Sequence, residues 1–219
     1  MNVLKIIQLS AWLTLLIVMV MTLLIRVEMH LDSKRNIQMD ELLRTCKTGD
    51  LILFKWYYMD AGFRMFSKFS HVGMVVSDSQ RTRILEMHPD GEYMDYPSGV
   101  YFHRLADRVK DYSGPCYFLR LKEDNARVQS FITENKSLLR GFEFDKNFRN
   151  NFVLNFFLAA MSVSTLTSPK KMFCSQFIGY ILYHSGYIQT PYELLSPGSF
   201  EYLEEDGVRL FARPMNIVW

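Results

Sequence analysis

HVGMVVSDSQRTRILEM, residues 71–87, predicts two short β-strands joined by a turn. The runs His71–Val76 and Arg83–Met87 are rich in β-branched and other apolar residues, which favour strands. The four polar residues between them, Ser77–Gln80, are of the kind that form turns. This stretch is therefore expected to form an antiparallel β-hairpin.

One face of the hairpin carries a histidine and a carboxylate. A two-residue loop at positions 78–79 would place His71 directly opposite Glu86. A carboxylate beside an imidazole orients the ring and stabilises its protonated form, so His71 is a candidate general base and Glu86 its acid partner. His88 follows Glu86 on the same strand face and is an alternative third member or a substrate contact. The remaining histidines lack such a pairing and are expected at the surface or in the core: His30, His103 and His184.

The other periodic segments predict an α+β domain with a small, mostly antiparallel sheet. Apolar or alternating runs favour two more strands, and helical spacing with Gly or Asp at the ends favours three helices. The expected strands are Leu51–Trp56 and Cys116–Leu121, and the expected helices are Asp40–Thr45, Asp124–Leu139 and Phe173–His184.

Cys174 lies in the first turn of the last predicted helix. A helix N-terminus stabilises a thiolate through its partial positive charge and free backbone amides, and those amides can also bind an oxyanion. Cys174 is therefore the candidate nucleophile. The alternative is a buried cysteine that acts as a small apolar side chain.

Composition excludes several classes of protein. Of 219 residues, 49% are hydrophobic and 22% are charged, which favours a packed domain over a disordered chain. The net charge is only +2 and the basic residues are dispersed, so nucleic acid is not an expected partner. The three cysteines, Cys46, Cys116 and Cys174, are far apart, which argues against a disulfide framework and a metal site. No cofactor is expected.

The N-terminal segment is apolar. Ile6–Ile25 contains no charged residue and is long enough to cross a bilayer, so it predicts one transmembrane helix rather than a cleaved signal peptide. The basic residues that follow it favour a single-pass membrane protein with its catalytic domain on the cytoplasmic, reducing side. The expected organisation is an anchor over residues 1–28, a linker with a short helix over 29–48, and a domain over 49–219.

Five stretches carry a resemblance to a known family: TGDLILFKW, FSHVGMVV, ILEMHP, GFEFD and FCSQFIGYIL. Together they resemble the permuted papain-like branch of the NlpC-type cysteine peptidases, especially its YiiX-like members. In that branch the histidine precedes the cysteine, as His71 precedes Cys174 here. Similar proteins occur in bacteria and in large DNA viruses, where one is a poxvirus virion protein. The lecithin:retinol acyltransferase group is related. The resemblance covers about Gly49–Gly186.

The resemblance implies a permuted papain-like fold and a triad of Cys174, His71 and Glu86, with Asp50 positioning backbone rather than reacting. Two features depart from the family pattern. Gln176 stands where the family often has Glu, and a long apolar insert, Asn147–Ser168, precedes the cysteine. The insert would be a lid, an acyl-binding wall, a membrane contact or a core element.

Two functions remain open at this stage. The first is a membrane-anchored thiol hydrolase or acyl transferase of amidase or peptidase type, acting on a peptide, an amide or a lipid acyl group through a thioester. The second is a structural membrane or virion protein that uses the domain as a scaffold beside neighbouring membrane or capsid proteins.

Overall fold

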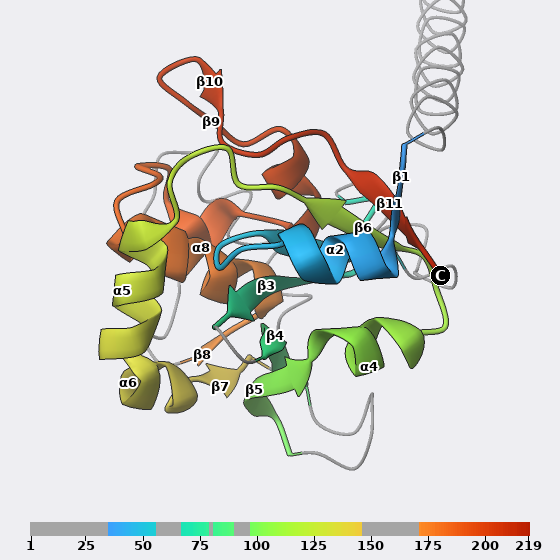
Figure 1. Ribbon diagram of the computed structural model, residues 1–219. Helices are drawn as coiled ribbons and strands as arrows, with labels where there is room; N and C mark the ends of the chain where they lie inside the picture. Colours follow the sequence, from blue (N-terminus) through green and yellow to red (C-terminus); the bar gives the residue numbers. More distant parts are fainter. Residues whose placement is uncertain (1–34, 56–66, 79–80, 90–96, 146–170) are drawn as a thin grey trace, which may run out of the picture. The chain divides into compact units, whose positions relative to one another are not determined.

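The computed structural model describes residues 35–55, 67–78, 81–89, 97–145 and 171–219. Most of these residues belong to one compact unit, Ile37–Trp219. Its main sheet has seven strands in the order β1-β11-β6-β2-β3-β4-β5 (Figure 1). The strands are β1 (Asn36–Gln38), β2 (Leu51–Phe54), β3 (His71–Ser77), β4 (Thr82–His88), β5 (Gly99–Arg104), β6 (Cys116–Leu119) and β11 (Met215–Val218).

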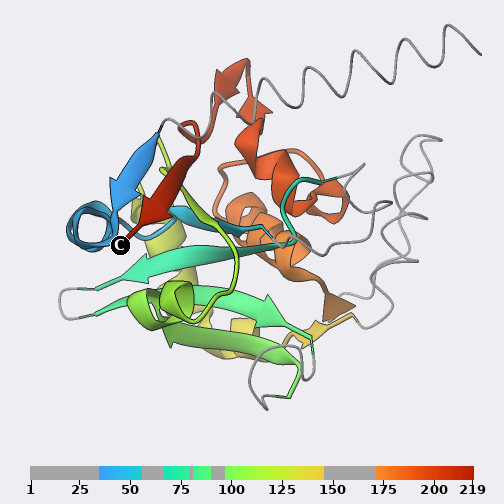
Figure 2. The same ribbon diagram turned by 90° about the vertical axis from the view of Figure 1, so that its right-hand side faces the viewer.

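Helices and short strands complete the described part. The helices are α2 (Met39–Thr45), α4 (Leu105–Lys110), α5 (Ala126–Glu134), α6 (Lys136–Arg140) and α8 (Cys174–His184), with 3-10 turns η1 (Tyr192–Leu194) and η2 (Pro197–Glu201). β7 (Glu143–Phe144) and β8 (Lys171–Met172) form a parallel pair. β9 (Glu204–Glu205) and β10 (Val208–Arg209) form a short ribbon that stands apart from the main sheet (Figure 2).

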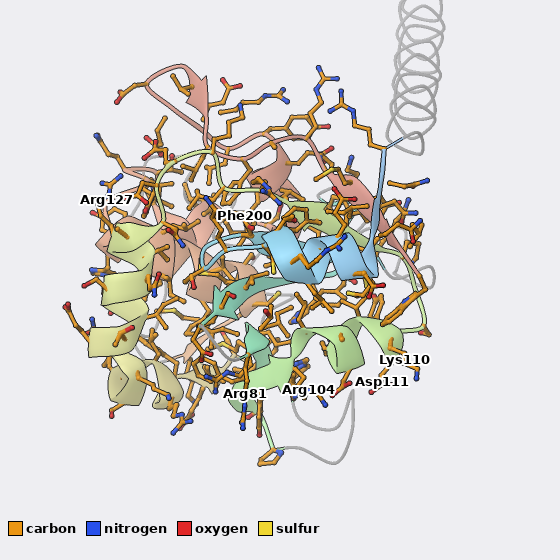
Figure 3. All side chains as sticks on the ribbon, viewed as in Figure 1. Arg81, Arg104, Lys110, Asp111, Arg127 and Phe200 are labelled. Atoms are coloured by element: carbon orange, nitrogen blue, oxygen red, sulfur yellow. The ribbon has the colours of Figure 1, made fainter. Side chains whose placement is uncertain are left out.

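The main sheet has an apolar core on each face. Alternate side chains of a strand point to opposite faces, so the continuous apolar run of β2 supplies both cores. Leu51 and Leu53 join the first core, which includes residues of α5 and α8. Ile52 and Phe54 join the second core, which includes residues of α2 and α4. Charged side chains such as Arg104 and Lys110 lie at the surface (Figure 3).

The hairpin forms, but with a different register from the predicted one. Ser77 pairs with Thr82 and Met74 with Leu85, so four residues, 78–81, separate the two strands. Asp78 caps the turn, because its Oδ1 accepts a hydrogen bond from the Arg81 amide at 2.8 Å. Extending this register places His71 opposite His88 rather than opposite Glu86. The shift is two residues, which keeps all three side chains on the same face.

The Gly-Asp turn before β2 positions backbone, as the sequence resemblance implied. Gly49 has a φ of 96°, a left-handed conformation that favours glycine. Asp50 is buried, and its carboxylate accepts hydrogen bonds from the Lys47 and Leu121 amides, each at 2.8 Å. The first bond closes the turn, and the second ties the start of β2 to the segment that follows β6.

The predicted fold class needs two corrections. The sheet is larger than expected, and the parallel β7–β8 pair lies outside it. No helix of the described ranges is both long and apolar enough to span a bilayer. On that finding, the fold class with an N-terminal transmembrane helix and the single-pass membrane localisation were wrong. The segment Ile6–Ile25, on which both depended, lies outside the described residues, as does the insert Asn147–Ser168.

Candidate active site

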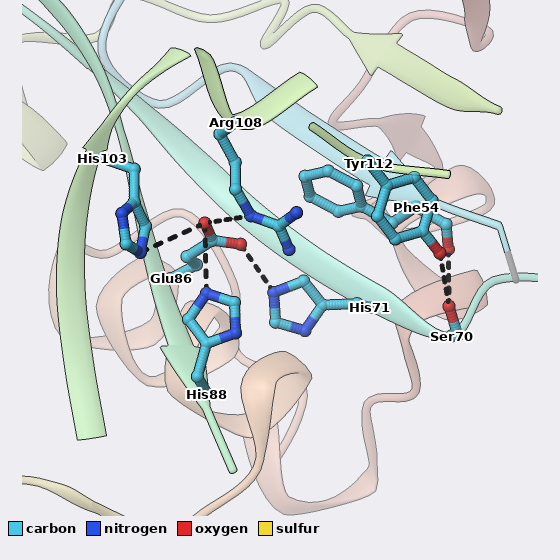
Figure 4. A network of polar contacts seen from close by, with 8 residues as sticks. All are labelled: Phe54, Ser70, His71, Glu86, His88, His103, Arg108 and Tyr112. Carbon is cyan, nitrogen blue, oxygen red and sulfur yellow. Dashed lines mark hydrogen bonds and ion pairs between the residues drawn. The ribbon is translucent and has the colours of Figure 1, made fainter. Parts of the chain in front are cut away.

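Glu86 is the centre of a buried polar cluster at one end of the sheet (Figure 4). Its Oε2 lies 2.8 Å from His71 Nε2, and its Oε1 accepts a hydrogen bond from Arg108 Nε at 2.7 Å. Two further imidazoles face Oε1, with His88 Nε2 at 3.2 Å and His103 Nε2 at 3.9 Å. The predicted contact between His71 and Glu86 is thus present, although the two residues are diagonal rather than directly opposite.

The cluster combines an ionised carboxylate with a neutral imidazole. Burial alone would raise the pKa of Glu86, but the His71 and His88 imidazoles and the Arg108 charge hold it well below its usual value. Burial lowers the pKa of His71 to about 4, despite the opposing effect of Glu86. Since an ionised carboxylate only accepts, His71 Nε2 must carry the proton. Nδ1 is then the basic nitrogen of the ring.

His88 is close to both proposed partners. Its ring stacks on that of His71, with centroids 5.1 Å apart and an interplanar angle of 26°. The His88 ring also contacts that of His103 on β5, and the centroids of these two rings are 5.5 Å apart. His88 therefore lies beside His71 and Glu86, on the strand face predicted for it, whereas His103 joins the cluster unexpectedly. The antiparallel pairing of Ile84 with His103 brings His103 to the Glu86 face.

Arg108 is the main member of the cluster that sequence analysis missed. It lies on α4, a helix that was not predicted, and only 5% of its side chain is exposed. Its guanidinium carbon lies 4.5 Å from the ring centroid of Phe54 and 5.5 Å from that of Tyr112. The buried face of α4 consists of Leu105, Arg108 and Val109. Their helical spacing is the signal that could have revealed the helix.

Cys174 lies in the first turn of α8, as predicted, and is the first residue of that helix. Two neighbouring residues fix this end of the helix. Ser175 Oγ donates a hydrogen bond to the Leu195 carbonyl at 2.6 Å. Gln176 accepts one from the Phe173 amide at 3.3 Å and donates one from Nε2 to the Glu193 carbonyl at 3.1 Å. The second bond needs a donor, which explains why Gln rather than ionised Glu fits this position.

The thiol of Cys174 lies beside the backbone of Val72, the residue that follows His71. Cys174 and Val72 both belong to the first core, whereas His71 points to the face of Phe54, with ring centroids 5.4 Å apart. The side chains of Cys174 and His71 thus lie on opposite faces of the sheet. Within the described residues, no hydrogen bond joins the Cys174 thiol to His71.

All three cysteines are free and buried. Burial raises the pKa of the Cys174 thiol to about 12, although hydrogen bonds with the backbone of Val72 and Ser175 act to lower this pKa. Burial also raises the pKa of Cys46 to about 11 and that of Cys116 to about 12. In the resting state the Cys174 thiol and the His71 imidazole are therefore both neutral.

The spacing of His71, Glu86 and His88 also suits a metal ion, since one donor atom from each lies within 4.8 Å of the others. Arg108 weighs against this interpretation. At about 4 Å and an effective dielectric constant of about 20, two unit charges interact by about 4 kcal/mol. Repulsion between the guanidinium and a divalent ion would thus be similar in size to the attraction from Glu86. The guanidinium already supplies the positive charge that a metal would bring.

Comparison with known proteins gives no family assignment. No family model matches the chain, and a search of curated proteins finds no match.

Proposed function

We propose that this domain is a thiol-dependent acyl hydrolase or acyl transferase with Cys174 as nucleophile, His71 as base and Glu86 as the orienting acid. One observation carries the proposal: His71 is held by Glu86 at 2.8 Å while the backbone of the adjacent Val72 contacts the Cys174 thiol. The order of these residues along the chain, and their motifs, also match the permuted papain-like pattern.

The roles follow from the protonation states. Glu86 fixes the proton of His71 on Nε2, which leaves Nδ1 to accept the thiol proton. The sulfur then bonds to the acyl carbon, and His71 returns the proton to the departing amine or alcohol. Water or another acceptor attacks the thioester and regenerates the thiol. The backbone amides at the start of α8 supply donors for the oxyanion. Because resting thiol and imidazole share no hydrogen bond, substrate must bring them together.

We propose a peptide or another amide as the substrate class and a lipid ester as the second choice. A thioester can form from either. The mechanism itself requires no metal or redox cofactor.

A scaffold function is the second candidate, and the burial of Cys174 favours it. Its side chain is only 6% exposed, and its thiol pKa resembles that of Cys116. A purely structural domain would keep such a thiol inert. The virion or other assembly role considered from the sequence belongs to this candidate.

Labelling of the full-length chain separates the two candidates. An acyl-phosphonate probe is applied at pH 7, followed by peptide mapping of Cys46, Cys116 and Cys174. The enzyme proposal expects Cys174 to react fastest, with no labelling of that site in Cys174→Ala. Glu86→Gln should slow labelling by up to about 10⁴-fold, because a neutral amide cannot stabilise imidazolium. His71→Ala should cost at least as much.

His184→Ala is the matched control, because this histidine is exposed at the far end of α8. It should leave the labelling rate unchanged. Equal rates at all three cysteines, or no effect of His71→Ala, would exclude the enzyme and favour the scaffold. If His88→Ala matches Cys174→Ala while Glu86→Gln is harmless, His88 is the third member instead.

A further inference from the structure

We infer that Arg108 is a positioning residue of the proposed site, whose guanidinium anchors the Glu86 carboxylate and supplies its counter-charge. This inference rests on the proposed function and deepens it, because it explains how the acid of the triad stays usable inside the protein.

The carboxylate of Glu86 needs a buried cation. Glu86 is fully buried, and an unpaired ionised carboxylate in such a place is strongly disfavoured. The three surrounding imidazoles cannot all supply charge, since burial lowers the pKa values of His71 and His103. Arg108 stays protonated in any protein environment and contacts Oε1 at 2.7 Å. Arg108 is therefore the cation that the buried Glu86 carboxylate requires.

The contact also fixes which oxygen serves His71. Arg108 donates to Oε1, so Oε2 is the oxygen that accepts the hydrogen bond from His71 Nε2 at 2.8 Å. The guanidinium itself lies against two aromatic rings, with its carbon 4.5 Å from the Phe54 ring centroid and 5.5 Å from that of Tyr112. The two rings are packed edge to face, with centroids 4.9 Å apart. Figure 4 shows Arg108 approaching Glu86 from the side opposite His88.

This geometry suits Arg better than Lys. A planar guanidinium can lie against aromatic rings while one edge donates to a carboxylate, whereas an ammonium is a compact and strongly hydrated charge. The titratable groups that face Glu86 and Arg108 come from five elements or their flanks and must all be considered in a pH profile. They are His71, His88, Tyr101, His103, Tyr112 and Cys116.

The test is a double-mutant cycle in the full-length chain. Arg108→Met and Arg108→Lys are made alone and together with Glu86→Gln. The rate constant for iodoacetamide labelling of Cys174 is measured by peptide mapping from pH 5 to pH 9. Arg108→Met should slow labelling at pH 7 by about tenfold or more and move the acid limb to higher pH by about one unit or more. Arg108→Lys should recover part of the rate, because it keeps the charge.

In the Glu86→Gln background the same Arg108→Met change should alter the rate by less than about twofold, because its target is gone. Equal losses in both backgrounds would show that Arg108 acts on folding alone and would overturn the inference. Arg108→Gln replaces the Met variant if that chain does not fold.

A second readout does not depend on the thiol. The side-chain carboxyl carbon of Glu86 is followed by NMR in glutamate-labelled protein, with Glu86→Gln used for assignment. In the wild type this signal should not titrate down to pH 4. In Arg108→Met the midpoint of its titration should lie at least about one pH unit above that of the wild type. An unchanged titration would refute the role of Arg108. If Cys174 instead labels no faster than Cys46 while the titration shifts, the proposed function fails but the Arg108–Glu86 coupling stands.

Discussion

Replacing His71 with Gln should make the stability of the domain less sensitive to acid. His71 has a pKa of about 4 in the folded protein, compared with an ordinary value of 6.5. The unfolded chain therefore binds more protons than the folded chain between these two values, and the free energy of unfolding falls as pH is lowered through this range. Gln can still donate a hydrogen bond to Glu86, but it does not titrate.

The size of the effect follows from the two pKa values. Each pH unit between them corresponds to about 1.4 kcal/mol, so the full contribution of His71 is about 3 kcal/mol. By pH 5 about 2 kcal/mol of it should be lost. The measured range from pH 7 to pH 5 lies above 4.5, the ordinary pKa of a glutamate, so the titration of Glu86 contributes little there. The 14% exposure of the His71 side chain allows only weak screening of this penalty by solvent.

Urea denaturation of the full-length chain, followed by far-UV circular dichroism at pH 7, 6 and 5, measures this difference. Wild type should lose about 2 kcal/mol more than His71→Gln between pH 7 and pH 5. His184→Gln is the matched control and should behave like wild type, because His184 is exposed. Parallel curves for wild type and His71→Gln would refute the neutral buried imidazole, and with it the assignment of Nδ1 as a free base.

Two further predictions concern the frame that carries the site. Gly73→Ala should destabilise the domain by about 1–3 kcal/mol in urea denaturation, because the added Cβ would lie 2.6 Å from Ile84 Cδ1 and 3.2 Å from Glu86 Cβ. A companion Ile84→Val change should recover part of the loss, and no cost at all would contradict this packing. Asp50→Ala should cost about 3 kcal/mol by the same assay, because two backbone amides lose their acceptor. Asp50→Asn should cost about half as much, and equal costs for the two variants would contradict this account.

The hairpin shows how much local sequence could predict. Alternating residues identified both strands, and side-chain parity alone put His71, Glu86 and His88 on one face. The loop length was wrong, because the side chain of Asp78 closes a four-residue connection that resembles a two-residue turn in sequence. An even shift preserves the face, so the contact between His71 and Glu86 survived the error. An odd shift would have separated them.

The predicted helices show a similar limit. α8 begins at Cys174, one residue from its predicted start. The helix could be predicted well because its apolar pattern is long and is closed by Gly186, which has a φ of 72°. The helix expected over Asp124–Leu139 is instead divided into α5 and α6 at Asn135. The side-chain amide of Asn135 donates to the Phe131 carbonyl at 2.9 Å, a local bond that competes with a continuous helix.

Arg108 and His103 could not be predicted as partners of Glu86 from local pattern alone. Both are polar residues in short elements, and their roles depend on β5 pairing with β4 and on α4 packing over the same face. A sequence shows which residues share a strand face, but not which helix covers that face. The charge of Glu86 therefore appeared available to His71 alone, whereas the fold divides it between a base and a permanent cation.

The placement of Cys174 has a consequence for catalysis. α8 packs with Val72 and Met74 in the first core, while His71 and Glu86 belong to the other face. His71 is the first residue of β3 and Cys174 is the first residue of α8, so both lie where their elements begin. Under the proposed function the thiol would have to reach the imidazole around the end of β3, because backbone would separate it from a residue inside the strand. This shared position, rather than a preformed thiolate, is what would let Cys174 pass its proton to His71 once a substrate draws the two together.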